Sequence, residues 1–435
     1  MVLHDARRNG VARLDKLPLH KRIFRTLGPG LITGASDDDP SGIGTYSQAG
    51  AQLGFAIGWT MLFSYPLMVA IQEIAARIGR TTGHGIAGAI RTHYPGWLLH
   101  AIVLLLFLAN TVNIGADLSA MGDAVQLLIG GPRALYVVPL AAACAGLQIF
   151  VPYARYAPLL KWMTLSLFAY FAALAVVKLD WLEFARGVLV PSLSADAEFW
   201  MTVVAVLGTT ISPYLFFWQA AQECEDIRAH PERQALRQAP RQGAAAIDRI
   251  RADTYVGMGI SNLVALAIIA TTAATLHAQG MHDIRTSAQA AAALKPLAGE
   301  FAFVLFAAGI VGTGMLAIPV LAGSTAYALA EARQWPIGLA REPRRAPAFY
   351  ATIAAATLCG VLLNFVPVDP IRALVLSAVV NGIIAAPVMA VIMLMATNRR
   401  IMGRFVIGPG LQIFGWTATA VMAAAAAAMF VAAAL

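Results

Sequence analysis

Ten long apolar stretches constrain the fold of this sequence more than any other feature. They cover residues 56–76, 97–120, 134–151, 157–177, 199–222, 254–277, 300–330, 347–366, 370–396 and 409–434. Each is close to the length of about 20 residues that a helix needs to cross the hydrocarbon core of a bilayer. Only helices and closed barrels satisfy their backbone hydrogen bonds there, and the alternating pattern of barrel strands is absent. The sequence therefore predicts an all-α polytopic membrane protein.

The composition excludes the main alternatives. Of the 435 residues 59% are hydrophobic and 12% are charged, with a mean hydropathy of +0.69, whereas a soluble domain is about 45–50% apolar and about 25% charged. Three widely separated cysteines, Cys144, Cys224 and Cys359, predict neither a disulfide framework nor a zinc site. The net charge of +8 comes from basic residues spread along the chain, so we expect no nucleic-acid partner.

The charge distribution predicts an eleventh crossing at residues 28–54. Cytoplasmic flanks of membrane helices collect Lys and Arg, and such clusters occur both in residues 1–27 and after the 56–76 stretch. Two cytoplasmic segments are separated by an even number of crossings, so residues 28–54 must cross as well. With this span included, 25 of the 31 Lys and Arg residues lie on one side. We expect eleven helices, with the N-terminus in the cytoplasm and the C-terminus in the periplasm or outside.

The predicted organisation is one membrane domain without a separate soluble domain. Residues 1–27 form a basic cytoplasmic tail and not a signal peptide, because they lack an apolar run followed by a small-residue cleavage site. Residues 28–435 form the transmembrane domain. The loops 223–253 and 331–346 are expected to be solvated connections, and the expected location is the inner (plasma) membrane of a bacterium.

Three consecutive aspartates in the first span predict a functional site, because ionisable residues within a span are costly. Asp37, Asp38 and Asp39 are followed directly by Pro40. Proline removes a backbone donor and disfavours a helical conformation of the preceding residue, so we expect a helix break with free carbonyls beside a carboxylate. This describes a cation site with Asp39 as ligand, whereas Asp37 or Asp38 is protonated, bonded to a helix end or exposed to a vestibule. The alternative is that residues 37–42 form a loop outside the membrane.

The sixth span has a second interruption, at Pro213, which follows Ser212. Broken helices five spans apart are typical of transporters built from two inverted five-helix repeats, with the substrate held between them. We expect repeats at residues 28–180 and 199–396, followed by an extra helix at 409–434. One chain contains both repeats, so a monomer is sufficient.

Further polar residues lie within the predicted spans. Asn110, Asn113 and Asp117 share one face of the third span, where they line a water path or hydrogen-bond to neighbouring helices. Asn381 in the tenth span is a candidate to reach the cation site. Gln219 on the second half of the sixth helix is expected to face the cytoplasmic vestibule.

Several motifs resemble those of the Nramp family of divalent-metal transporters. The run from Gly28 to Gly42 and the segment up to Phe55 resemble the family's first helix. Residues 72–83 resemble the end of its second helix, and Asp117-Leu-Ser-Ala resembles its third-helix acidic motif. The resemblance extends from residue 25 to about residue 400. It implies the LeuT-type fold, with eleven helices, an inverted 5+5 repeat, and helices 1 and 6 broken at the midplane.

The departures from the family pattern concern the metal ligands. Family members dedicated to manganese and iron carry Asp-Pro-Gly-Asn in helix 1 and Met-Pro-His in helix 6. This sequence has Asp39-Pro-Ser-Gly42 and Ser212-Pro-Tyr214 at these places. The ligands that the resemblance implies are Asp39, the carbonyl oxygens of Gly42 and Thr209, and Ser212 or Asn381, directly or through water.

The loss of the methionine favours a hard ion as cargo. A thioether is a soft ligand, whereas hydroxyl, carbonyl and carboxylate oxygens suit hard ions. Mg²⁺ dehydrates reluctantly and is held by one or two carboxylates with several retained waters, and Gly42 widens the site by removing a side chain. The sequence thus resembles the Nramp-related magnesium transporters, which carry Mg²⁺ and also Mn²⁺. The metal is the transported substrate, and no cofactor is expected.

Proton coupling is expected to be absent or weak. Family members that co-transport protons use acids on helix 3 and histidines on helix 6. Here Asp117 is kept, but Asn110 and Ala120 occupy the glutamate positions, and Tyr214 and Gln219 the histidine positions. We therefore expect uptake that is driven by the membrane potential.

Two alternatives to this function stay open. One is a proton-coupled Mn²⁺/Fe²⁺ symporter with an unusual site. The other is an organic-solute carrier of the same fold, such as an amino-acid transporter, against which three aspartates at the first break argue because such a carrier binds the substrate's carboxylate. An enzyme is not expected, since no nucleophile–base pair or HExxH pattern is present.

Overall fold

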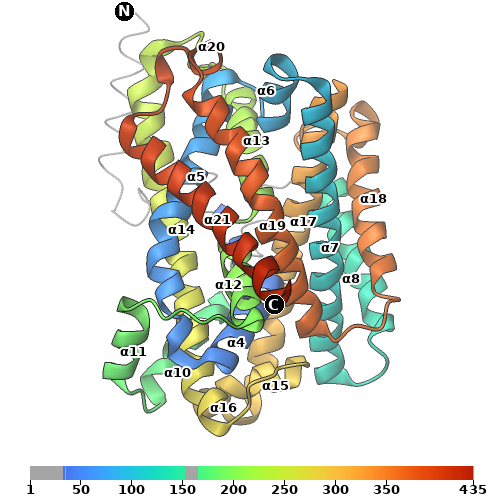
Figure 1. The fold of residues 1–435 in the computed structure, drawn as a ribbon. Helices are drawn as coiled ribbons and strands as arrows, with labels where there is room; N and C mark the ends of the chain where they lie inside the picture. Colours follow the sequence, from blue (N-terminus) through green and yellow to red (C-terminus); the bar gives the residue numbers. More distant parts are fainter. Residues whose placement is uncertain (1–32, 35, 152–164, 435) are drawn as a thin grey trace, which may run out of the picture.

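The computed structural model describes residues 33–34, 36–151 and 165–434, and its regular structure in these ranges is helical (Figure 1). No strand occurs in these ranges, in agreement with the all-α prediction. The predicted tail at residues 1–27 lies outside the described residues, as does part of the predicted fifth span.

The long helices follow the predicted spans closely. The first span is represented by α4 (Pro40–Leu53) and by a helical turn before it. The others are α5 (Trp59–Thr82), α7 (Gly96–Ile129), α8 (Ala134–Phe150), α10 (Ala169–Val176), α12 (Ala197–Thr210), α13 (Pro213–Ala229), α14 (Gly243–Thr275), α17 (Ala302–Arg333), α18 (Pro347–Leu363), α19 (Pro370–Thr397) and α21 (Pro409–Ala434).

The helices of the described residues can be matched to the eleven predicted spans. Seven helical segments in the described part of the chain are long and apolar enough to cross a membrane. Three shorter apolar helices, Ala134–Phe150, Leu165–Val176 and Pro347–Leu363, coincide with the predicted fourth, fifth and ninth spans. The broken first helix completes the set.

The connections are more helical than predicted. The sequence predicts a solvated connection at residues 223–253, but α13 continues to Ala229 and α14 begins at Gly243. Hydropathy marks only the part of a helix that lies in hydrocarbon, and polar turns continue several of these helices beyond it. Short helices between the spans are α6 (Ile86–His93), α11 (Trp181–Leu189), α15 (Ser287–Ala291), α16 (Lys295–Ala298) and α20 (Arg399–Met402).

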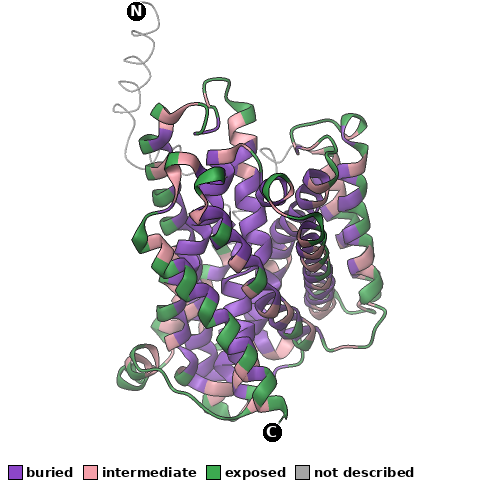
Figure 2. Cartoon of the chain, turned by 45° about the horizontal axis from the view of Figure 1, so that its top comes forward, coloured by how far each residue is buried: buried purple, intermediate pink, exposed green. Residues whose placement is uncertain are grey.

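Buried residues fill the interior of the bundle, and exposed residues line its outside (Figure 2). The exposed residues include large apolar side chains such as Leu104, Leu108, Phe150, Leu358 and Phe430. So many exposed apolar side chains are unfavourable in water but contact lipid in a bilayer. The surface therefore agrees with a protein embedded in a membrane.

Small residues bring α12 and α19 into direct backbone contact. A Cβ atom on Gly208 would collide with the carbonyl oxygen of Ala378 and the backbone nitrogen of Gly382. A Cβ atom on Gly382 would lie 2.6 Å from the carbonyl oxygen of Val204. Such residues let membrane helices approach closely, so α12 is held against α19 just before the break in the sixth helix.

We predict that Gly208→Ala destabilises the protein by about 1–3 kcal/mol, because the added methyl group forces two packed backbones apart. The matched control is Gly146→Ala in α8, where a Cβ atom meets nothing within 4 Å. Thermal unfolding of the purified protein in detergent measures both variants. A Gly208→Ala variant that melts at the wild-type temperature would contradict the prediction.

Candidate metal site

Both predicted helix breaks are present, and a half-helix that begins with proline follows each of them. In the first span the helical turn ends at Asp37, and α4 begins at Pro40 after Asp39 as N-cap. In the sixth span α12 ends at Thr210 and α13 begins at Pro213. Proline suits the first position of a helix, because the N–H that it lacks would have no partner within the helix.

The carboxylate of Asp39 joins three helices. Its Oδ1 accepts a hydrogen bond of 2.7 Å from the backbone N–H of Gly42, which caps α4. Its Oδ2 accepts a bond of 2.9 Å from Nδ2 of Asn113 on α7, and lies 3.4 Å from the hydroxyl of Tyr214 on α13. An ionised carboxylate offers about four lone-pair positions. Two are taken by the amides and a third lies beside Tyr214, so Asp39 keeps acceptor capacity for a cation.

Tyr214 ties the two breaks together. Its hydroxyl donates a hydrogen bond of 2.9 Å to the carbonyl oxygen of Ser36, which is shorter than the distance to Asp39. The ring is buried, with 1% of its surface exposed. Where the family pattern has histidine, this chain therefore has a phenol that bridges α13 and the first half of helix 1.

Gly42 and Thr209 bring the two breaks into contact. A Cβ atom on Gly42 would lie 3.2 Å from the carbonyl oxygen of Asp37 and 3.2 Å from Oγ1 of Thr209. The missing side chain thus lets α4, α12 and the preceding turn close on one another, and its space is filled in this conformation. Gly42 also lies inside α4, where carbonyl oxygens accept from the amide four residues on. For its carbonyl to reach an ion, the first turn of α4 must change.

The hydroxyl of Ser212 is turned back toward α12. It donates to the carbonyl oxygens of Gly208 and Thr209, each at 2.8 Å. The Thr209 carbonyl lies in the last turn of α12, which is the partially negative end of that helix. Two of the predicted ligands, the Thr209 carbonyl and Ser212, are therefore neighbours at the second break.

Asp37 and Asp38 face α14. The hydroxyl of Ser261 lies 2.5 Å from Oδ2 of Asp37 and 3.0 Å from Oδ1 of Asp38. Both aspartates are buried, and Oδ1 of Asp37 has no hydrogen-bond partner. Their shared partner is thus a side chain of another helix, which the sequence did not indicate.

The polar residues predicted to share one face of α7 contact two different regions of the protein. Asn113 contacts the first break through Asp39, and Asp117 accepts a hydrogen bond of 3.1 Å from the backbone N–H of Ser41. Asn110 instead donates to the carbonyl oxygen of Leu321 on α17 at 3.0 Å. Only two of the three residues therefore belong to the site.

Asn381 and Gln219 also differ in their surroundings. Asn381 on α19 is 1% exposed, and its Oδ1 has no partner. Gln219 is 1% exposed and bonds to Gln72 of α5 and to Thr254 of α14, at 2.5 and 3.0 Å. It joins helices in this conformation, whereas the sequence predicts that it faces an open vestibule.

Hydroxyl groups near Asp39 were not found from the sequence. Ser377 of α19 donates to Oδ1 of Asn113 at 2.9 Å, and its Oγ lies 3.1 Å from Oγ of Ser41. Serines within membrane spans commonly bond to neighbouring helices. That tendency is the only signal in the sequence, and it does not name the partner.

The site offers oxygen donors around a single central carboxylate. In the part of the chain that the structure describes, no group of three or more His, Cys, Asp and Glu residues is placed to hold a metal ion. Asp39 would thus act with backbone carbonyls at the ends of the two half-helices, which carry partial negative charge. Carboxylate, carbonyl and hydroxyl oxygens suit hard cations.

The opposite end of α13 is joined to α5 and α14 by ion pairs. Arg249 of α14 lies 2.5 Å from Glu223 of α13, and Arg251 of α14 lies 3.6 Å from Glu73 of α5. Arg77 also pairs with Glu73. Both glutamates are buried, so these contacts close the end of the bundle that carries the basic loops.

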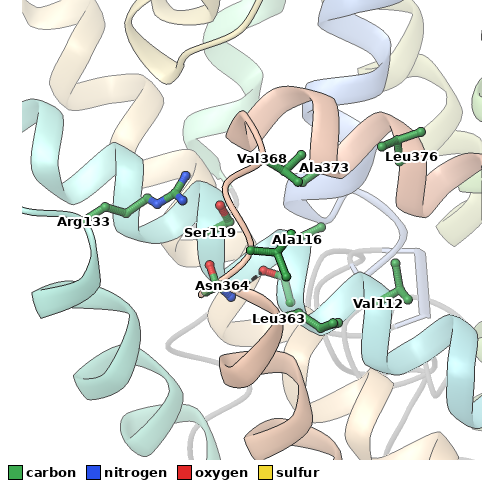
Figure 3. A pocket seen from close by; sticks show the side chains of 11 residues that line it. Val112, Ala116, Ser119, Arg133, Leu363, Asn364, Val368, Ala373 and Leu376 are labelled. Atoms are coloured by element: carbon green, nitrogen blue, oxygen red, sulfur yellow. Dashed lines mark hydrogen bonds between the residues drawn. The ribbon is translucent and has the colours of Figure 1, made fainter.

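A pocket of about 200 Å³ between α7 and α19 lies apart from the two breaks (Figure 3). Its lining is mostly aliphatic, and its charged residue is Arg133, which would repel a cation. Asn364 at this pocket donates to the carbonyl oxygen of Gly115 at 3.0 Å. The pocket is therefore not part of the candidate site.

Comparisons with known proteins agree on one family. The family profile described as "Natural resistance-associated macrophage protein-like" (Nramp) matches residues 30–432. The divalent metal cation transporter MntH of Pectobacterium carotovorum is 27% identical over 401 residues, which cover 89% of this chain and 90% of the relative. MntH of Burkholderia ambifaria is 26% identical, with coverages of 96% and 89%.

Solved structures show the same fold. A crystal structure of the manganese transporter of Eremococcus coleocola, in complex with an aromatic bis-isothiourea compound, has a TM-score of 0.73 and 16% sequence identity. The likeness covers 94% of this chain and 87% of that one. The predicted LeuT-type architecture is confirmed, and with a matching family profile over nearly its whole length the chain belongs to the Nramp family.

Proposed function

We propose that this protein imports divalent metal cations by alternating access, with Mg²⁺ as its main cargo and Mn²⁺ as a second one. The relatives named above are divalent metal cation transporters, and the charge distribution favours a cytoplasmic N-terminus. The choice of ion rests on the donor set around Asp39. Ser212 occupies the position of the methionine in the family pattern, so the thioether that would favour a transition metal is missing.

Unpartnered oxygen atoms near the breaks support an ion that keeps part of its water. Asp117 on α7 is 0% exposed and its Oδ2 has no hydrogen-bond partner, and the same holds for Oδ1 of the buried Asn381. Buried acceptors are normally bonded to protein or to ordered water. Water molecules on a Mg²⁺ ion, which sheds them reluctantly, would donate to both oxygens.

The membrane potential suffices to drive uptake without protons. The helix-6 positions of the family's histidines carry Tyr214 and Gln219, both of which bond to neighbouring helices. A potential of about 100 mV contributes about 2.3 kcal/mol per charge, so the entry of a divalent ion is favoured by about 4.6 kcal/mol of free energy. This corresponds to an accumulation of about a thousandfold.

A second candidate is a proton-coupled Mn²⁺ symporter. It is favoured by Asp117, which is kept in the acidic motif. Oδ1 of Asp117 accepts a hydrogen bond from the backbone N–H of Ser41 at the first break, and its Oδ2 has no hydrogen-bond partner. The similar solved structure from Eremococcus coleocola is that of a manganese transporter. The two candidates differ in cargo and in proton movement, which one flux experiment measures together.

We predict that Mg²⁺ enters proteoliposomes at a fixed inside-negative potential without acidifying their interior. Fluorescent indicators for Mg²⁺ and for pH, enclosed in the same vesicles, record both quantities. Empty liposomes serve as the control. Entry of Mn²⁺ with protons, and no entry of Mg²⁺, would replace the proposal with the second candidate.

Asp39→Ala is expected to abolish transport and metal binding at the two helix breaks, because it removes the carboxylate that lies between both half-helices. The metal affinity of this site should fall by more than about a hundredfold, since a charged ligand of a partly dehydrated ion is removed. Isothermal titration with Mn²⁺ and Mg²⁺ influx measure the two effects. Asp248→Ala, at an exposed position of α14, is the matched control. Near-normal uptake by a folded Asp39→Ala protein would remove the basis of the site.

Ser212→Met is expected to shift the preference from Mg²⁺ toward Mn²⁺ and Cd²⁺, because it places a soft thioether beside the Thr209 carbonyl. The shift should be about tenfold or more in the ratio of transport rates, measured by competition. Ser212→Ala, which removes the hydroxyl without adding sulfur, should not produce it. If Ser212→Met keeps the wild-type ratio, softness at this position does not decide selectivity.

A further inference from the structure

A polar cavity of about 390 Å³ lies at the end of the bundle opposite the basic loops. It is enclosed by α4, α12, the start of α19 and the loop at residues 282–285. We call it the outer vestibule. Thr45, Gln48 and Gln52 line it from α4, and Glu198 and Thr202 line it from α12.

The outer vestibule leads toward the candidate metal site. Thr45, Gln48 and Gln52 follow one another at spacings of three and four residues, so they share one face of α4. Asp39 precedes Thr45 by six residues, which is about 9 Å along a helix. The helix α12 runs from Glu198 at the vestibule to Thr209 at the second break. Both helices therefore connect the vestibule with the site.

The outer vestibule is lined by three carboxylates, Glu198, Asp283 and Asp369, and by two arginines, Arg285 and Arg372, so its negative charge is only partly compensated. Asp283 pairs with Arg285 at 2.9 Å. Neither Glu198 nor Asp369 takes part in any of the ion pairs of the described residues. The carboxylate of Glu198 accepts a hydrogen bond of 3.4 Å from Nε2 of the neutral amide of Gln52. Its carboxylate is exposed and available to a cation.

A buried hydroxyl marks the inner end of the outer vestibule. Thr45 is 1% exposed and lines the cavity, but its Oγ1 has no hydrogen-bond partner. Leaving such a buried group without a partner is unfavourable. Water, or the water shell of a ligand, is therefore needed at this point. The hydroxyl of Thr202, in contrast, has a partner. It donates to Oε1 of Gln52 at 2.9 Å and so fixes the orientation of that amide.

We propose that the outer vestibule is a second cation site, which takes up a hydrated divalent cation before it moves to Asp39. Glu198 and Asp369 attract the ion through its water shell, and the α4 side chains from Gln52 to Thr45 contact its water molecules. Three carboxylates against two arginines leave the lining with an excess of one negative charge, and negative charge in a cleft raises the local concentration of cations. The inference rests on the proposed function only for the identity of the cargo.

Binding to the second site is tested where the first site is disabled. In the full-length Asp39→Ala protein, electron paramagnetic resonance of added Mn²⁺ should detect about one weakly bound ion per chain. Adding Glu198→Gln or Thr45→Val should weaken this binding about tenfold. Glu300→Gln, an exposed carboxylate at the same end that does not line the cavity, is the matched control.

Transport supplies a second reading of the same inference. In the otherwise unchanged protein, Glu198→Gln should raise KM for Mg²⁺ about tenfold, while the rate at saturating Mg²⁺ falls far less. Glu300→Gln should leave both constants at their wild-type values.

The outcomes separate this inference from the proposed function. If Asp39→Ala binds no Mn²⁺ at millimolar concentration, or if Glu198→Gln behaves like Glu300→Gln, the second site is overturned and the proposed function stands. If the wild-type protein itself neither binds nor carries Mg²⁺ or Mn²⁺, both are overturned.

Discussion

The structure depends on how backbone groups are satisfied at two helix breaks that lie away from water. Asp39 provides an acceptor for the first turn of α4, Tyr214 provides a donor for Ser36, and Ser212 provides one for the end of α12. In a dry interior each unpaired group would cost several kcal/mol. Asp39 and Ser212 are also candidate ligands. In the proposed function, ion binding would therefore exchange their present contacts for contacts with the ion.

The two ends of the bundle are built differently. At one end ion pairs between Glu73, Glu223 and the arginines of α14 hold α5, α13 and α14 together. At the other end a polar cavity reaches inward along α4 and α12. In its open states, a carrier that works by alternating access is closed at one end and accessible from the other. The arrangement corresponds to a protein closed at the end with the basic loops and hollowed at the opposite end.

The sequence predicts the spans and both breaks well, because long apolar runs and prolines within them act locally. It does not predict where the polar side chains point. Asp37 and Asp38 share a hydroxyl on α14, and Asn113 reaches Asp39 while Asn110 reaches α17. These partners are brought together by packing between distant segments. The close contacts around Gly42 have the same origin. From the sequence the missing side chain is expected to widen the site, whereas in the structure it lets the helices approach one another.

The contact between Gly208 and Gly382 has a consequence for motion. No side chain separates the two backbones there, so nothing can rotate or repack to absorb a displacement. At this point α12 and α19 cannot move closer together, because their backbones are already in contact. A displacement of α12 toward α19 would therefore push α19 in the same direction.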